Sequence, residues 1–262
     1  MVEPDFIIGG GQRCGTTTLY KLLDQHPQIY LAKPIHPEPK FFVHEPCPGR
    51  DRPWYLETWF ADVPDVIAVG EKSTSYLETP AAPARIKAMF PAMRAVFILR
   101  HPIERAISNY RFTRAHGLEP ETFDRAVQIE ASRLANTQFD DISAHPHAYL
   151  RRSRFADHLE RYREVFRREE IEIVLNNQLQ QNEGAVGRKL YEFLNVDTTF
   201  QPPRLAVREN AHAPDDLTIA RGTVDDLLDY FAEPNRRLSE MFDLDLSGWN
   251  RPTPMIESLV RK

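Results

Sequence analysis

A glycine-rich segment close to the N-terminus has the residue types of an anion-binding loop. Residues 9–18 read GGGQRCGTTT and stand between the apolar run Phe6–Ile8 and the mostly apolar segment Leu19–Leu23. Glycines allow consecutive backbone N–H groups to converge, and the start of a helix adds partial positive charge. We therefore predict that this segment binds phosphate. The plain alternative is a turn that only joins a strand to a helix.

The same segment departs from the two common nucleotide-binding motifs. Gly10 and Gly15 have the spacing of the nucleotide triphosphate P-loop, but Thr16 stands where that motif requires lysine, and the positive side chain of the loop is Arg13. Cys14 stands at the third glycine position of a dinucleotide-binding motif that starts at Gly9. Neither a Mg-ATP site nor a dinucleotide site is favoured.

A second candidate anion site follows the apolar run Val96–Leu99. Arg100 at the end of that run presents a planar group of donors that suits phosphate, and Ser108, two helical turns on, offers a hydroxyl. Two sites on one sheet would fit a ligand with two separated anionic groups. The alternatives are a structural ion pair between Arg100 and Glu104 and a neutral surface position for Ser108.

Apolar runs that alternate with helical patterns must position these residues. We expect strands at Phe6–Ile8, Val66–Val69, Ala95–Leu99 and Ile171–Leu175. Such alternation predicts an α/β fold of P-loop-like, three-layer α/β/α type with a central, mostly parallel sheet, whose ligands bind at the carboxyl ends of the strands. Lys33–Pro53 contains six prolines and is predicted to be loop. Helices are expected at about Thr16–Asp24, Glu104–Arg114, Arg154–Arg167, Glu183–Leu194, Val224–Phe231 and Pro234–Phe242.

Composition limits the possible classes of protein. A chain of 262 residues can form one domain, which we expect over residues 1–262, and a net charge of −5 argues against nucleic acid as a partner. The two cysteines give no pattern for a disulfide framework or a zinc site, and no other metal site is expected. Without an evident export signal or membrane span, the expected location is cytoplasmic.

The order of these motifs resembles the sulfotransferases that depend on 3′-phosphoadenosine 5′-phosphosulfate (PAPS), especially the heparan sulfate and other carbohydrate sulfotransferases. Phe97–Tyr110 resembles the family's 3′-phosphate element, and Arg100 and Ser108 stand at the matching positions. Glu38–Phe42 is similar to the segment whose glutamate is the catalytic base, and Gly70–Tyr76 to the segment whose lysine, here Lys72, lies beside donor and acceptor. Leu227–Trp249 resembles the closing helices. The 5′-phosphosulfate loop of the family matches Gly11, Gln12, Arg13, Cys14, Gly15, Thr16, Thr17 and Thr18, and a looser match places Arg208 near the 3′-phosphate.

The resemblance implies transfer of a sulfuryl group from PAPS to a hydroxyl of a small-molecule or carbohydrate acceptor, with 3′-phosphoadenosine 5′-phosphate (PAP) as product and no metal. The attacking and leaving oxygens would be in line, Glu38 would take the proton, and Arg13 and Lys72 would neutralise the leaving group. The carbohydrate branch usually has lysine where Arg13 stands. Arginine is a poor proton donor, so Arg13 is expected to act electrostatically, or only to bind the 5′-phosphate. The alternatives are a P-loop-type kinase or NTPase and a catalytically silent nucleotide-binding protein.

Overall fold

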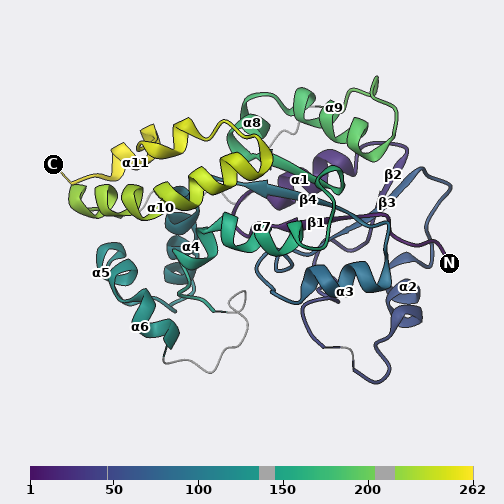
Figure 1. Ribbon diagram of the computed structural model, residues 1–262, viewed down its shortest axis with the longest axis horizontal. Coiled ribbons are helices and arrows are strands. Elements are labelled where there is room, and N and C mark those ends of the chain that lie inside the picture. Colours follow the sequence, from purple (N-terminus) through teal and green to yellow (C-terminus); the bar gives the residue numbers. More distant parts are fainter. Residues whose placement is uncertain (46, 136–144, 204–215, 262) are drawn as a thin grey trace. The chain divides into compact units, whose positions relative to one another are not determined.

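The chain forms two compact units in a computed structural model that describes residues 1–45, 47–135, 145–203 and 216–261 (Figure 1). The first unit comprises Met1–Leu99 and Arg161–Glu209, and the second comprises Arg100–Glu160 and Asn210–Lys262. Among the described residues, no helix combines the length and the apolar character needed to cross a bilayer.

The first unit is built on a parallel sheet. In the described residues its strands are β1 (Phe6–Gly10), β2 (Ile29–Leu31), β3 (Ala68–Lys72), β4 (Arg94–Leu99) and β5 (Ile171–Leu175), in the order β2-β3-β1-β4-β5, and every pair is parallel. The strands are buried almost throughout, as expected for a sheet covered on both faces. The predicted fold class is therefore confirmed.

Helices cover the two faces of this sheet. Helices α1 (Thr16–Leu23) and α9 (Glu183–Leu194) lie together on one face, and α3 (Ala82–Met89) lies on the other (Figure 1). The unit also contains α2 (Arg52–Phe60), α8 (Asn176–Gln181) and the 3-10 turn Arg168–Glu170. The described residues between β2 and α2 contain neither helix nor strand, which confirms the predicted proline-rich loop up to Asp51, whereas its last two residues, Arg52 and Pro53, begin α2.

The second unit is helical. Its core packs side chains of α4 (Pro102–Ala115), α5 (Phe123–Gln128), α10 (Arg221–Phe242) and α11 (Pro254–Leu259) against one another. The remaining described elements are α6 (Glu130–Ala135), the 3-10 turns Arg151–Ser153 and Ser247–Asn250, and α7 (Phe155–Arg163), which starts in this unit and ends in the first.

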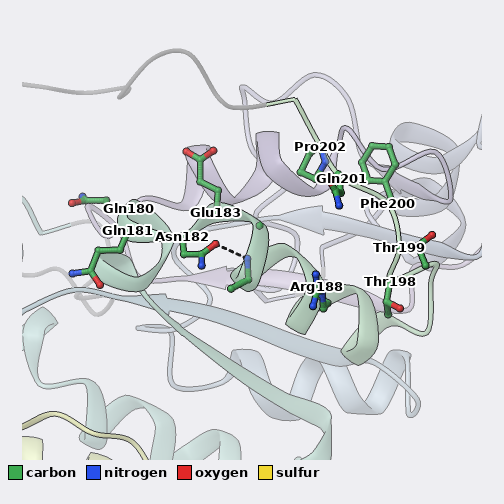
Figure 2. Close-up of a pocket in the computed structure, with 12 residues that line it drawn as sticks. Gln180, Gln181, Asn182, Glu183, Arg188, Thr198, Thr199, Phe200, Gln201 and Pro202 are labelled. Atoms are coloured by element: carbon green, nitrogen blue, oxygen red, sulfur yellow. Dashed lines mark hydrogen bonds between the residues drawn. The ribbon is translucent and has the colours of Figure 1, made fainter.

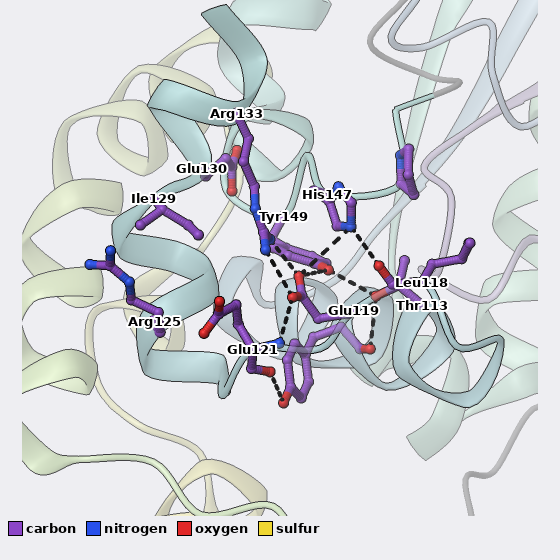
Figure 3. A network of polar contacts seen from close by, with 12 residues as sticks. Thr113, Leu118, Glu119, Glu121, Arg125, Ile129, Glu130, Arg133, His147 and Tyr149 are labelled. Carbon is purple, nitrogen blue, oxygen red and sulfur yellow. Dashed lines mark hydrogen bonds and ion pairs between the residues drawn. The ribbon is translucent and has the colours of Figure 1, made fainter. Parts of the chain in front are cut away.

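Buried charges join the helices of the second unit to its loops. The fully buried Arg105 of α4 donates to the Ser153 hydroxyl and to the Tyr149 carbonyl, each at 2.6 Å. Figure 3 shows a second network, in which Glu119 accepts hydrogen bonds from Arg133 (2.6 and 3.1 Å) and from the Tyr149 hydroxyl (2.7 Å). Burial alone would raise the pKa of Glu119, but the bonds from Arg133 and Tyr149 outweigh it and hold the pKa below its ordinary value.

The structure corrects one helix prediction and several boundaries. The sequence predicted a break between Phe231 and Pro234, but α10 continues through Pro234. Proline removes one backbone hydrogen bond there, yet Leu227, Phe231, Pro234 and Leu238 form one buried face, and its packing holds the helix together. Strand β3 lies two to three residues later than predicted, so it ends at Lys72, and α7 is shorter than the predicted Arg154–Arg167. The short strand β2 was missed.

Candidate active site

The predicted anion-binding loop lies between β1 and α1, as the sequence indicates. The Gly11 N–H donates to the Ile98 carbonyl at 2.8 Å, which ties the start of the loop to β4. Gly15 is the N-cap of α1 with a left-handed φ of 103°, and α1 has neither a side-chain cap nor an acidic residue in its first turn. Because the first N–H groups of a helix have no acceptor within the helix, Thr16–Thr18 offer donors and partial positive charge to an anion.

Glycine is required at two positions of this loop. A Cβ atom on Gly10, whose φ is 138°, would lie 2.8 Å from the Thr74 carbonyl oxygen and from the Leu77 Cβ atom. A Cβ atom on Gly15 would lie 2.6 Å from Nδ2 of Asn176, which donates to the Cys14 carbonyl at 2.8 Å. The chain is thus folded tightly around the loop by residues that follow β3 and β5.

Glu38 and Lys72, which lie 34 residues apart in the chain, form a nearly buried ion pair. Lys72 Nζ lies 2.5 Å from Glu38 Oε1, and the two side chains are 2% and 8% exposed. The other carboxylate oxygen accepts from the Thr74 N–H at 3.0 Å and from the Thr74 hydroxyl at 2.9 Å. A carboxylate can accept about four hydrogen bonds, so these three donors leave room for one more.

This cluster lies against the start of the glycine loop. The segment after β3 donates from Ser73 N to the Ile8 carbonyl at 3.1 Å and from Leu77 N to the Gly9 carbonyl at 2.8 Å. Thr74, which holds Glu38, therefore also contacts Gly10. The structure thus brings Glu38, Lys72 and the loop together at the carboxyl edge of the sheet. Arg13 lies in that loop, half-buried and with a left-handed φ of 67°.

The second predicted anion element lies in the second unit. Arg100 Nε donates to Glu104 at 2.8 Å, and Glu104 also accepts from the Thr253 hydroxyl at 2.6 Å. The ion pair that the sequence left open as an alternative is therefore present, although it uses one of the five N–H donors of the guanidinium. Ser108 is buried on α4. Arg208 lies outside the described residues.

One buried acid beside this cluster had no role assigned to it from the sequence. Glu71 of β3 is fully buried, and its carboxylate accepts hydrogen bonds from the hydroxyls of Tyr55, Ser73 and Tyr76. Burial raises its pKa to about 7, and the three hydrogen bonds only partly oppose that rise. Its place directly before Lys72, in the segment Gly70–Tyr76 that resembles the family, is the signal that could have marked it.

Two hollows adjoin the first unit's elements. One of about 900 Å³ lies between the end of α8, the start of α9 and residues 198–202, and its described lining contains no predicted site residue (Figure 2). The other, of about 410 Å³, adjoins the loop that carries Glu38 and is lined by Phe41 and Trp54, whose rings stack 6.1 Å apart. Tyr55, the residue after Trp54, is fully buried in the core.

Comparisons with known proteins identify the family of this chain. The family profile described as "Sulfotransferase domain" matches residues 3–214. The bifunctional heparan sulfate N-deacetylase/N-sulfotransferase 1 of Homo sapiens is 30% identical over 205 residues, which is 75% of this chain and 22% of that protein. The heparan sulfate glucosamine 3-O-sulfotransferase 3B1 of Mus musculus is 26% identical over 268 residues, 94% of this chain and 65% of that protein. The chain thus spans about a fifth of the length of the first relative and just under two thirds of the second.

A solved structure extends the match to nearly the whole chain. The crystal structure of a sulfotransferase from Alicyclobacillus acidocaldarius superimposes with a TM-score of 0.78 and is 28% identical, and the match covers 96% of this chain and 100% of that one. The sequence profile, the relatives and this solved structure all point to the same family. The chain therefore belongs to the sulfotransferase family.

Proposed function

We propose that this chain transfers a sulfuryl group from PAPS to a hydroxyl of a carbohydrate or small-molecule acceptor. The observation that carries the proposal is the buried Glu38–Lys72 pair held against the glycine loop in a chain of the sulfotransferase family. The names of two relatives include heparan sulfate, which supports a carbohydrate acceptor. The cytoplasmic location expected from the sequence stays a prediction.

The loop before α1 has the features that the 5′ end of the donor needs. Its helix start lacks a side-chain cap and an acidic residue, so an anion would meet N–H donors and no competing carboxylate in that first turn. We assign the 5′ end of PAPS to Gly11–Thr18, and the 3′-phosphate to Arg100, Ser108 and Arg208 on the strength of the resemblance. When bound, PAPS supplies the sulfuryl group and PAP remains.

Glu38 has the geometry of a general base. Its carboxylate already accepts from Lys72 and Thr74, which fix its orientation, and it keeps capacity for the proton of an acceptor hydroxyl. Lys72 provides positive charge at the same point, and Arg13 provides it in the loop. Because arginine stays protonated in proteins, Arg13 stabilises negative charge and does not transfer a proton.

Ligand binding separates this proposal from a kinase. PAP at about 100 times its dissociation constant should stabilise the fold by about 2.7 kcal/mol, whereas ATP with magnesium should not. Thermal unfolding with each ligand measures both. A shift with ATP and magnesium but none with PAP would favour the P-loop kinase or NTPase.

Transfer of label from isotopically labelled PAPS identifies the acceptor and tests the base. Glucosamine-containing oligosaccharides and their N-acetylated forms make a matched pair of acceptors: equal labelling of both indicates a hydroxyl acceptor, and loss of labelling on N-acetylation indicates an amine. With the acceptor that is labelled, Glu38→Gln should lower kcat by about 10²–10⁴-fold while PAP affinity stays unchanged. If PAP binds but no acceptor is labelled, the silent nucleotide-binding protein is the better reading.

A further inference from the structure

The buried Glu71 carboxylate gathers three hydroxyls around it. Tyr55 and Tyr76 donate to Oε1 at 3.0 and 2.7 Å, and Ser73 donates to Oε2 at 2.7 Å. Glu71 stands next to Lys72 at the end of β3, yet the proposed reaction gives it no task. A carboxylate is suited to this place because it can accept from all three donors at once.

Two of these hydroxyls also hold the loop that carries Glu38. The Lys40 N–H donates to the Ser73 hydroxyl at 2.8 Å, and the Phe42 N–H makes a longer contact of 3.4 Å with the Tyr76 hydroxyl. A hydroxyl has a single proton, so a hydroxyl that donates it to Glu71 turns its lone pairs toward the loop N–H groups. Glu71 therefore sets the direction of both hydrogen-bond chains.

The loop needs such an external hold. Lys40, two residues after Glu38, has a left-handed φ of 48°, a conformation that side-chain-bearing residues adopt at a cost. The Lys40 N–H is the atom that the Ser73 hydroxyl binds. The next residue after Ser73 is Thr74, which holds the Glu38 carboxylate itself. The backbone near Glu38 and its carboxylate are thus fixed by adjacent residues of one segment.

We propose that Glu71 is a positioning residue for the candidate base: through Ser73 and Tyr76 it fixes the loop at Lys40 and Phe42 and so places the Glu38 carboxylate. The inference rests on the proposed function for its effect on the reaction. Its effect on the loop can be measured without any acceptor.

Amide hydrogen exchange of the full chain tests the hold on the loop. Ser73→Ala should raise exchange at Lys40 about fivefold to tenfold, the loss expected for one hydrogen bond. Glu71→Gln should also raise exchange at Lys40. If the amide oxygen of the glutamine accepts from the two tyrosines, its NH₂ group faces Ser73, and the Ser73 hydroxyl proton then loses its acceptor. Tyr55→Phe is the matched control: it removes one hydroxyl from Glu71 but none from the loop, and exchange at Lys40 should stay within twofold.

Kinetics then test the effect on the base. Glu71→Gln and Ser73→Ala should each lower kcat at least tenfold while PAP affinity, measured by calorimetry, stays within twofold of the wild type. Unchanged exchange at Lys40 in both variants would overturn the proposal, and so would faster exchange with unchanged kcat or an equal effect of Tyr55→Phe. If Glu71→Gln does not fold, Ser73→Ala decides by itself. A wild-type chain that neither binds PAP nor labels an acceptor would refute the proposed function, and the exchange data would still judge the role of Glu71 in the loop.

Discussion

Acidification should stabilise the wild-type chain relative to a Glu71→Gln variant. Burial raises the pKa of Glu71 from 4.5 to about 7 in the fold, whereas the unfolded chain keeps the ordinary value. Between these two values the folded state binds more protons than the unfolded state, so this contribution to stability is fully present below pH 4.5 and is lost as the pH rises through about 7. The glutamine variant cannot titrate at this position and lacks the effect.

The size of the effect follows from the two pKa values. The difference between them corresponds to about 3 kcal/mol, at about 1.4 kcal/mol for each pH unit. Because Glu71 is fully buried, solvent screening does not reduce this figure. From pH 5 to pH 8 the free energy of unfolding of the wild type should therefore fall by between about 2 and 3 kcal/mol relative to Glu71→Gln.

Urea unfolding of both proteins at each pH unit from 5 to 8 measures this quantity. The titrations of all other groups are common to both proteins, so the difference between the two free energies isolates Glu71. A difference that stays constant within about 0.5 kcal/mol over this range would refute the reasoning, since it would mean that the carboxyl titrates alike in the folded and unfolded chains.

Three further outcomes are expected. Lys72→Met should lower the free energy of unfolding, measured with urea, by about 3–5 kcal/mol, because the nearly buried Glu38 carboxylate loses its cation. Adding Glu38→Gln should restore most of the lost stability. No recovery in the double variant would contradict the pairing of Glu38 with Lys72. Gly10→Ala should lower the free energy of unfolding by about 1–3 kcal/mol or more, because Gly10 has a positive φ and close neighbours. A thermal midpoint equal to that of the wild type would argue against the tight loop. Arg100→Ala should weaken PAP binding, measured by calorimetry, by about 10–100-fold, because the site loses a charged hydrogen-bond donor. Arg236→Ala breaks an exposed ion pair of the same i,i+4 spacing and should leave PAP binding unchanged. Equal effects of the two variants would exclude Arg100 from the PAP site.

Local patterns in the sequence predict the strongest elements well. Ile171–Leu175 and Glu183–Leu194 have the predicted bounds, because an apolar run of strand length and an amphipathic run with Asn182 as its cap are both decided locally. Strand β2 has three residues, too few to show a periodicity. Pro234 misled the helix prediction because burial of one long face outweighs the loss of a single backbone hydrogen bond.

The parts of the candidate site also differ in how well the sequence predicts them. The glycine loop is contiguous in sequence, so its composition was enough to predict a turn between a strand and a helix, and its anion binding stays a prediction. Glu38 and Lys72 meet only after the sheet has formed, and it was the resemblance to a family that singled them out. The surroundings of Glu71 could not be predicted, because they depend on Tyr55 of a separate helix and on hydroxyl orientations in the folded core.

Asn176 gives the outermost strand of the sheet an influence on the anion-binding loop. It is the first residue after β5, and its amide both binds the Cys14 carbonyl and fills the space beside Gly15. Here, loss of that amide would leave the Cys14 carbonyl without this hydrogen bond and would open a space beside Gly15, so the turn before α1 depends on a residue 162 positions away in the chain.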